Sequence, residues 1–147
     1  MIVIASAGSE HLDGWALLRH VLWDEVSVAE HRAEAEEQLA EPERFLNLVA
    51  LDGDAVAGFA EASIRHEYVN GCEDSPVLFL EGICVAPDAR RRGIARKLVA
   101  AVADWGRAQG IREFASDTWH DDLESHAFHL AAGFAETERV VYFRQEL

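Results

Sequence analysis

The chain has 147 residues, half of them hydrophobic, which is enough for one globular domain with its own core and too few for two. Its 27 acidic and 13 basic residues give a net charge of −14, which argues against a nucleic-acid-binding protein and favours a cationic or polar partner. Five basic residues fall within 90–97, where there is no acidic one. Elsewhere eight basic residues face all 27 acidic ones, a net of −19.

Neither the N-terminus nor the cysteine content suggests export. The opening MIVIASAGSEHLDG has no basic region and too short an apolar run for a signal peptide, and no stretch reaches the roughly 18 apolar residues of a membrane span. Cys72 and Cys84 form no CxxC pair, and no histidine cluster beside them has zinc spacing. We therefore expect one cytoplasmic domain over residues 1–147, with no metal.

The first half of the chain predicts strands and helices in alternation. Residues 2–5 favour a strand, and Ser9 is a candidate N-cap for a helix to about residue 23. The capping-box pattern SVAE at 27–30 predicts a second helix to about residue 39, acidic and expected on the surface. Two strands over 45–51 and 56–64 flank a turn at 52–54.

The second half predicts a buried strand over 77–85 (VLFLEGICV), in which Gly82 indicates a bulge. A long amphipathic helix over 93–109 ends at Gly110. A strand at 113–118, a short helix at 122–132 and a last strand at 138–144 complete the pattern. The fold class is α/β (α+β): a mixed sheet of about six to seven strands, the fourth bulged, with about four helices.

The strongest local signal for chemistry lies between the buried strand and the long helix. Pro87 ends the strand, and RRRGIA at 90–95 leads into the helix. Free amides and the positive end of the dipole at a helix start bind pyrophosphate, and flanking arginines neutralise it. The run matches neither GxxxxGK[ST] nor GxGxxG. A solvated charged turn is the alternative.

At Arg90, Gly93 and Ala95 the sequence resembles the signature of the GNAT superfamily of N-acetyltransferases, Arg or Gln followed by Gly and then Gly or Ala. The resemblance implies a loop that grips the pyrophosphate of acetyl-CoA and a bulged strand beside its pantetheine. The cofactor-binding residues that it implies are Ile83, Cys84, Val85, Arg90, Arg91, Arg92, Gly93, Ile94, Ala95, Arg96, Asp122, Ser125 and His129.

Scattered segments narrow this resemblance to aminoglycoside 6'-N-acetyltransferases. They lie at residues 15, 22–23, 68–72, 79–83, 115–118 and 136–143. The resemblance implies a homodimer, a prediction that the apolar last strand also favours, and a sugar-binding cleft lined by Trp23 and Tyr68, with Asp24 and Glu138 as further substrate residues. From the residues alone, both aromatics could equally be core or rim residues, and Glu138 a charge at the sheet edge.

The last helix departs from the superfamily pattern. Many members place a tyrosine there as general acid, in a Phe-Tyr-x-x-x-Gly-Phe setting, but this chain has His129 after Phe128. The asparagine that often contacts the cofactor is replaced by Asp122, with Ser125 retained. His129 therefore stays open between a packed helix histidine and a proton donor.

Acetyl transfer to an amine needs a base, because most such amines are ammonium ions at neutral pH. Glu81 is a lone carboxylate in an apolar run, and Asp117 lies on the neighbouring strand, so we expect both beside the bulge as base or ammonium anchors. Cys84 is predicted to be buried and inert. Acetylation of a polyamine or of protein amines, and a CoA-binding module without turnover, remain the alternatives.

Overall fold

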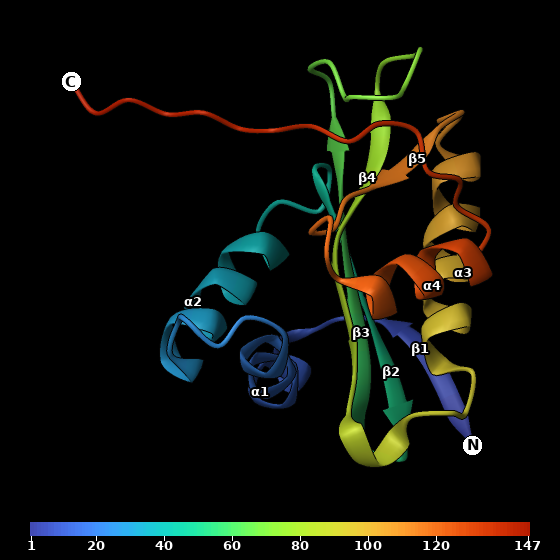
Figure 1. Ribbon diagram of the computed structural model, residues 1–147. Helices are drawn as coiled ribbons and strands as arrows, with labels where there is room; N and C mark the ends of the chain where they lie inside the picture. The colour runs from blue at the N-terminus through green and yellow to red at the C-terminus, as the bar shows by residue number, and fades with distance from the viewer.

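The computed structural model describes residues 1–147, and its centre is one five-stranded sheet (Figure 1). The strands follow chain order across the sheet: β1 (Ile2–Ser6), β2 (Phe45–Asp52), β3 (Ala55–Arg65), β4 (Val77–Val85) and β5 (Phe114–Ser116). β1 to β4 are antiparallel, whereas β5 is parallel to β4. This is the predicted mixed sheet, with fewer strands.

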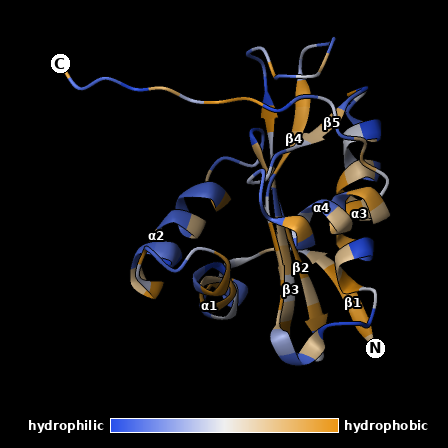
Figure 2. Cartoon of the chain, in the orientation of Figure 1, coloured by the Kyte–Doolittle hydropathy of each residue, from blue (hydrophilic) through white to orange (hydrophobic).

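Four α-helices cover the two faces of the sheet, as Figure 1 shows. They are α1 (Leu12–Leu22), α2 (Val28–Leu39), α3 (Ile94–Ala108) and α4 (Leu123–Ala131). α1 and α2 lie on one face, and α3 and α4 on the other. Figure 2 shows the strands of the sheet as largely hydrophobic and α2 as largely hydrophilic. None of them is both long and apolar enough to span a bilayer.

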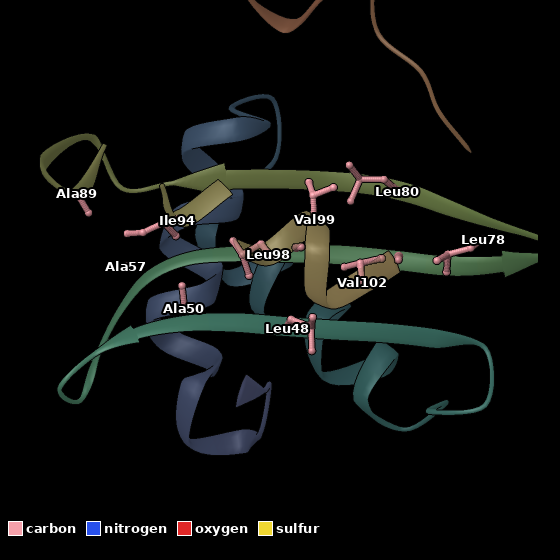
Figure 3. Close-up of a cluster of buried hydrophobic side chains, with 12 residues drawn as sticks. Leu48, Ala50, Ala57, Leu78, Leu80, Ala89, Ile94, Leu98, Val99 and Val102 are labelled. Atoms are coloured by element: carbon pink, nitrogen blue, oxygen red, sulfur yellow. The ribbon is translucent and has the colours of Figure 1, made fainter. Parts of the chain in front are cut away.

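The larger core lies under α3. Ile94, Leu98 and Val102 recur at helical spacing, and all three are buried against small and aliphatic residues of β2, β3 and β4 (Figure 3). A side chain at Gly106 would collide with Leu78, so this glycine lets the end of α3 approach β4 closely. The predicted amphipathic helix is confirmed, and it fixes the loop that precedes it.

A second core packs α1 against the opposite face. Trp15 is fully buried there with Val49 and Phe59. Ser27 caps α2 as predicted, since its hydroxyl accepts the amide of Glu30 at 3.2 Å. The expectation that α2 lies on the surface holds for its acidic side, but His31 is 1% exposed. The cause is a buried polar network described below.

Two expectations about the chain ends are wrong. The predicted N-cap at Ser9 is not formed, because residues 9–11 form a 3₁₀ turn and the α-helix begins only at Leu12. In that turn the Gly8 amide donates to His11 Nδ1. Residues 138–144 form no strand, which leaves five strands where six to seven were predicted. A strand needs a neighbour for its backbone groups, and the segment that follows α4 passes the upper end of the sheet and then runs away from it (Figure 1).

Candidate active site

The site begins at an irregularity between β3 and β4. Glu61 pairs with Gly82 and Ala62 with Leu80, so Glu81 is an extra residue on β4, as the predicted bulge requires. The parallel ladder between β4 and β5 ends at Leu80 and Ser116, although β4 continues to Val85. The two strands therefore part at this point, and Glu81 and Asp117 are the first residues beyond it, at matching positions.

Two side chains of β3 hold Glu81. Ser63 donates its hydroxyl to Oε1 at 2.5 Å. The Arg65 guanidinium reaches both carboxylate oxygens, with Nη2 2.9 Å from each and Nε 3.1 Å from Oε1. Arg65 Cζ also lies 3.5 Å from the centroid of the Phe79 ring. The side chains of Arg65 and Glu81 are each 32% exposed, so water still reaches this ion pair.

Two clefts meet at Glu81. The larger, of about 720 Å³, is lined by β3 and the segment before β2. Its other charged or titratable lining residues are Glu41, Glu43, Arg44, Arg65, His66 and Glu67. The smaller, of about 550 Å³, includes Trp23, Glu25, Glu34 and Gln38 in its wall, and it shares Glu81 and Phe45 with the larger one. Carboxylates outnumber cations in both, which suits a cationic ligand.

A buried ion pair lies behind the bulge. Arg19 of α1 and Glu61 of β3 pair at 4% and 3% exposure of their side chains. Trp15 Nε1 and Gln38 Nε2 also donate to the Glu61 carboxylate, at 2.9 and 3.1 Å. Arg19 Nη2 reaches Glu34 at 2.6 Å. A buried carboxylate with this many donors is a fixed structural anion, because separating it from Arg19 would leave two charges without solvent.

The same network fixes Trp23. Arg19 Nε–H donates to His31 Nδ1 at 3.3 Å, and Nε2–H of His31 donates to the Trp23 carbonyl at 2.7 Å. The Trp23 ring stacks on His31 with centroids 6.2 Å apart, and Arg19 Cζ lies 5.0 Å from it. A side chain at Gly82 would collide with this ring. Trp23 is therefore a wall of the smaller cleft, against the bulge.

The loop before α3 presents backbone groups. Arg91 and Gly93 both have positive φ, +66° and +74°, and the first turn of α3 has neither a side-chain cap nor an acidic residue. A Cβ at Gly93 would meet nothing within 4 Å. The first amides of α3 therefore have no side-chain partner, which leaves them and the helix dipole available to an anion. Arg92, by contrast, is paired with Asp52 at 2.9 Å, which lowers the pKa of that carboxyl.

Beyond the parting point, β4 offers its backbone edge at Ile83, Cys84 and Val85. Arg90 Nε donates to the Val85 carbonyl at 3.3 Å, which ties the basic loop to the strand. The Cys84 side chain is buried in the core beneath α1, and this burial raises the pKa of its thiol, with Arg90 as a smaller opposing influence. Both facts fit the predicted inert cysteine.

His129 joins α4 to the end of β5. Its Nδ1 lies 2.7 Å from the Ser125 carbonyl, so Nδ1 carries the proton, and Nε2 accepts the Ser116 hydroxyl at 2.8 Å. Asp122 accepts the Ser125 amide at 3.0 Å and so caps α4. His129 is thus hydrogen-bonded to the last residue of β5, next to Asp117 in the chain.

Four predicted substrate residues do not line the two clefts: Asp117, although it follows β5 opposite Glu81, and three others. Tyr68 is 75% exposed, Asp24 is exposed in the turn after α1, and Glu138 lies on the segment after α4. Residues that the sequence did not single out are Arg65, Arg19, Glu61 and His31. One signal was available: Glu61, Ser63 and Arg65 alternate on β3, so they share one face of the sheet.

Comparisons with known proteins identify the family of the chain and similar folds. The profile of the acetyltransferase (GNAT) family matches residues 15–134. An aminoglycoside N(6')-acetyltransferase type 1 of Serratia marcescens is 51% identical, over all of this chain and 99% of its own length. The structure of AAC(6')-Iy in complex with the bisubstrate analog CoA-S-monomethyl-acetylneamine is 44% identical, with a TM-score of 0.92 over 100% of this chain and 99% of its own. AAC(6')-IG from Acinetobacter haemolyticus, without ligand, gives the same identity and TM-score, over 99% of each chain.

Proposed function

The chain belongs to the acetyltransferase (GNAT) family, and from that premise we propose that it transfers the acetyl group of acetyl-CoA to the 6'-amine of aminoglycosides, which makes it an antibiotic-resistance enzyme. The observation that carries the proposal is the meeting, where β4 and β5 part, of an anion-binding loop and two acidic clefts. The relatives of 43–51% identity support it, as does the relative bound to a CoA and neamine conjugate.

The loop before α3 fits the pyrophosphate of CoA. The uncapped amides of the first turn of α3 would hold it, with Gly93 leaving room for close approach, and Arg90, Arg91 and Arg96 would neutralise it. The unpaired edge of Ile83–Val85 would lie along the pantetheine, and Ser125 and His129 of α4 would line the other side. Arg92 is already paired with Asp52, so its contribution would be smaller.

The acidic clefts fit a polycation. Glu81 and Asp117 would hold the reacting amine and accept its proton, directly or through water, while Glu25, Glu34 and the unpaired buried Gln38 Oε1 offer acceptors to further ammonium groups in the smaller cleft. The Trp23 ring would support a sugar ring or a cation. Because the acceptors outnumber the donors, a neutral acceptor would use them poorly.

The transfer would be direct. Bound acetyl-CoA supplies a thioester as acetyl donor. As the amine attacks, a backbone N–H of the unpaired β4 edge donates to the oxygen that gains charge. No nucleophile of the chain is needed, since the Cys84 thiol faces the core and its pKa is raised. Water or a protonated His129 would supply the proton of the departing thiolate, since in the neutral ring Nδ1–H is bonded to the Ser125 carbonyl and Nε2 accepts the Ser116 hydroxyl.

The test is a panel assay of thiol release from acetyl-CoA with kanamycin-type aminoglycosides, polyamines and peptides. We expect turnover with the aminoglycosides and, by mass spectrometry and NMR of the product, acetylation at the 6'-amine. Turnover with peptides or polyamines but not with aminoglycosides would contradict the proposed substrate and favour acetylation of those amines instead. CoA binding without turnover of any amine would favour the non-catalytic module.

We also propose that the protein acts as a homodimer. Residues 135–147 are here named the C-terminal arm. Thr137 lies close to Gly71, and beyond it the arm leaves the body in Figure 1, where its apolar Val141, Tyr142 and Phe143 are 78–93% exposed. The edge of β5 has no partner strand on its outer side. A second copy would cover this apolar arm. We expect light scattering to give a dimer for the full chain and a monomer for Phe143→Asp; a monomeric full chain would contradict the proposal.

The proposed site of action is the cytoplasm. Both cysteines are free thiols, and disulfides are rare in that compartment. Glu138 lies on the C-terminal arm, so its predicted role depends on where the arm lies, and Tyr68 and Asp24 remain predicted substrate residues. Replacement of each by alanine, with KM for the aminoglycoside as the readout, tests these assignments.

A further inference from the structure

Two arginine–glutamate pairs lie beside the bulge, and they differ in exposure. The pair of Arg19 and Glu61 is 4% and 3% exposed, and further donors fix the carboxylate. The pair of Arg65 and Glu81 is 32% exposed on each side, and it borders both clefts. Arg19 and Glu61 also line the smaller cleft, but their low exposure and the further donors on Glu61 hold them together. The second pair is the one open to exchange with an incoming cation, because water and a ligand reach its charges.

We propose that Arg65 occupies the place of the substrate's ammonium group on Glu81 in the free protein, and that the amine must displace it in order to bind. This inference rests on the proposed function. Three N–H···O contacts from Arg65 reach Glu81, so an ammonium group finds this carboxylate already paired. The exchange replaces one cation by another on Glu81, so the carboxylate keeps a counterion throughout, and this makes the displacement feasible.

The structure provides for both partners after the exchange. Ser63 keeps its hydrogen bond to Glu81 Oε1, so the carboxylate stays oriented without Arg65. The released guanidinium remains in a cleft that Glu41, Glu43 and Glu67 also line, and these carboxylates can receive it. What is lost is the bidentate contact with Glu81 and the stacking on Phe79. Arg65 therefore sets the affinity for the amine by competing with it.

The test compares Arg65→Gln with Arg44→Gln in steady-state kinetics. Both changes remove one positive charge from the larger cleft, but Arg44 contacts Glu41 and not Glu81. In Arg65→Gln we expect KM for a kanamycin-type aminoglycoside to fall about tenfold, because no charged hydrogen bonds must be broken. We expect kcat and KM for acetyl-CoA to stay within about threefold, and Arg44→Gln to change KM for the amine by no more than about twofold.

Arg65→Lys keeps the charge but not the bidentate contact, so its KM for the aminoglycoside should lie between the values of the wild-type protein and Arg65→Gln. An equal fall of KM in Arg65→Gln and Arg44→Gln would overturn the inference in favour of a general field effect. An unchanged or higher KM, or a tenfold loss of kcat, would also overturn it, because Arg65 would then stay on Glu81 and position it.

Calorimetry of aminoglycoside binding without acetyl-CoA separates this inference from the proposed function. A wild-type protein that binds the drug without turnover would refute the proposed activity, and the dissociation constants of the same variants would still judge Arg65. Turnover by the wild-type protein with no change in Arg65→Gln refutes the inference about Arg65 alone. A protein that neither binds nor acetylates the drug refutes both.

Discussion

The loop before α3 and the clefts around Glu81 differ in the groups from which they are built. The loop presents uncapped backbone amides, positive φ angles and a helix dipole, all within residues 87–97. The clefts present side chains that come from α1, α2, β3 and β4 and hold one another through hydrogen bonds. The loop therefore depends on local backbone conformation, and the clefts depend on the tertiary pairing of charges.

The largest effect should come from the carboxylates where β4 and β5 part. We expect Glu81→Ala and Asp117→Ala each to lower kcat for the aminoglycoside by about a hundredfold to ten-thousandfold, the usual contribution of a positioned base. KM for acetyl-CoA should stay nearly unchanged, because the amides of the loop are intact. Glu67→Ala is the matched control, a carboxylate of the larger cleft away from the parting point. Full activity in either variant would show that the replaced carboxylate is neither the base nor an anchor for the reacting amine.

The buried ion pair should dominate stability. Glu61→Gln leaves Arg19 buried with only the half-exposed Glu34 as counterion, so we expect the free energy of unfolding to fall by about 3 kcal/mol. Glu34→Gln removes the exposed partner of the same arginine and should cost less than about 1 kcal/mol. Urea denaturation measures both. Equal losses would mean that Glu61 and Glu34 share the charge of Arg19 evenly.

The difference between the two regions explains what the sequence could predict. The anion-binding loop was predictable, because Pro87, Gly93 and the apolar stripe of α3 follow one another in the chain. The bulge was predictable from Gly82 within an apolar run. The Arg19–Glu61 and Arg65–Glu81 pairs join residues 42 and 16 positions apart, so only the register of the sheet and the packing of α1 bring them together.

In the C-terminal arm the sequence predicts an element that the structure lacks. Its apolar run favours a strand, and the sequence predicts one at 138–144. A strand also needs a partner, and within one copy of the chain no strand lies beside residues 138–144. Local preference was therefore insufficient there, whereas for α3 the preference and the packing agree. His31 is a similar case: an acidic helix predicted a solvated side chain, and the network of Arg19 buries it.

The backbone of the loop can be tested through Gly93. Alanine at φ +74° costs about 1–2 kcal/mol, so in Gly93→Ala the loop should leave this conformation and KM for acetyl-CoA should rise about tenfold. Gly110→Ala is the matched control, since Gly110 also has positive φ (+79°), no atom within 4 Å of its Cβ position, and a place at the other end of α3. It should destabilise the protein similarly and leave KM for acetyl-CoA unchanged. KM for the aminoglycoside should hardly change in either variant.

The smallest effect concerns Cys84, which lies between the two regions with its backbone on the open edge of β4 and its side chain in the core. Burial raises the pKa of its thiol, so less thiolate is present at neutral pH than in an exposed cysteine, and the thiolate is the nucleophile. Iodoacetamide should therefore modify Cys84 more slowly than a free cysteine, and faster as the pH rises towards the raised pKa. Incubation with acetyl-CoA without an amine should leave the intact mass of the protein unchanged. An acetyl group on Cys84 that a later aminoglycoside removes would show a covalent intermediate and would contradict direct transfer.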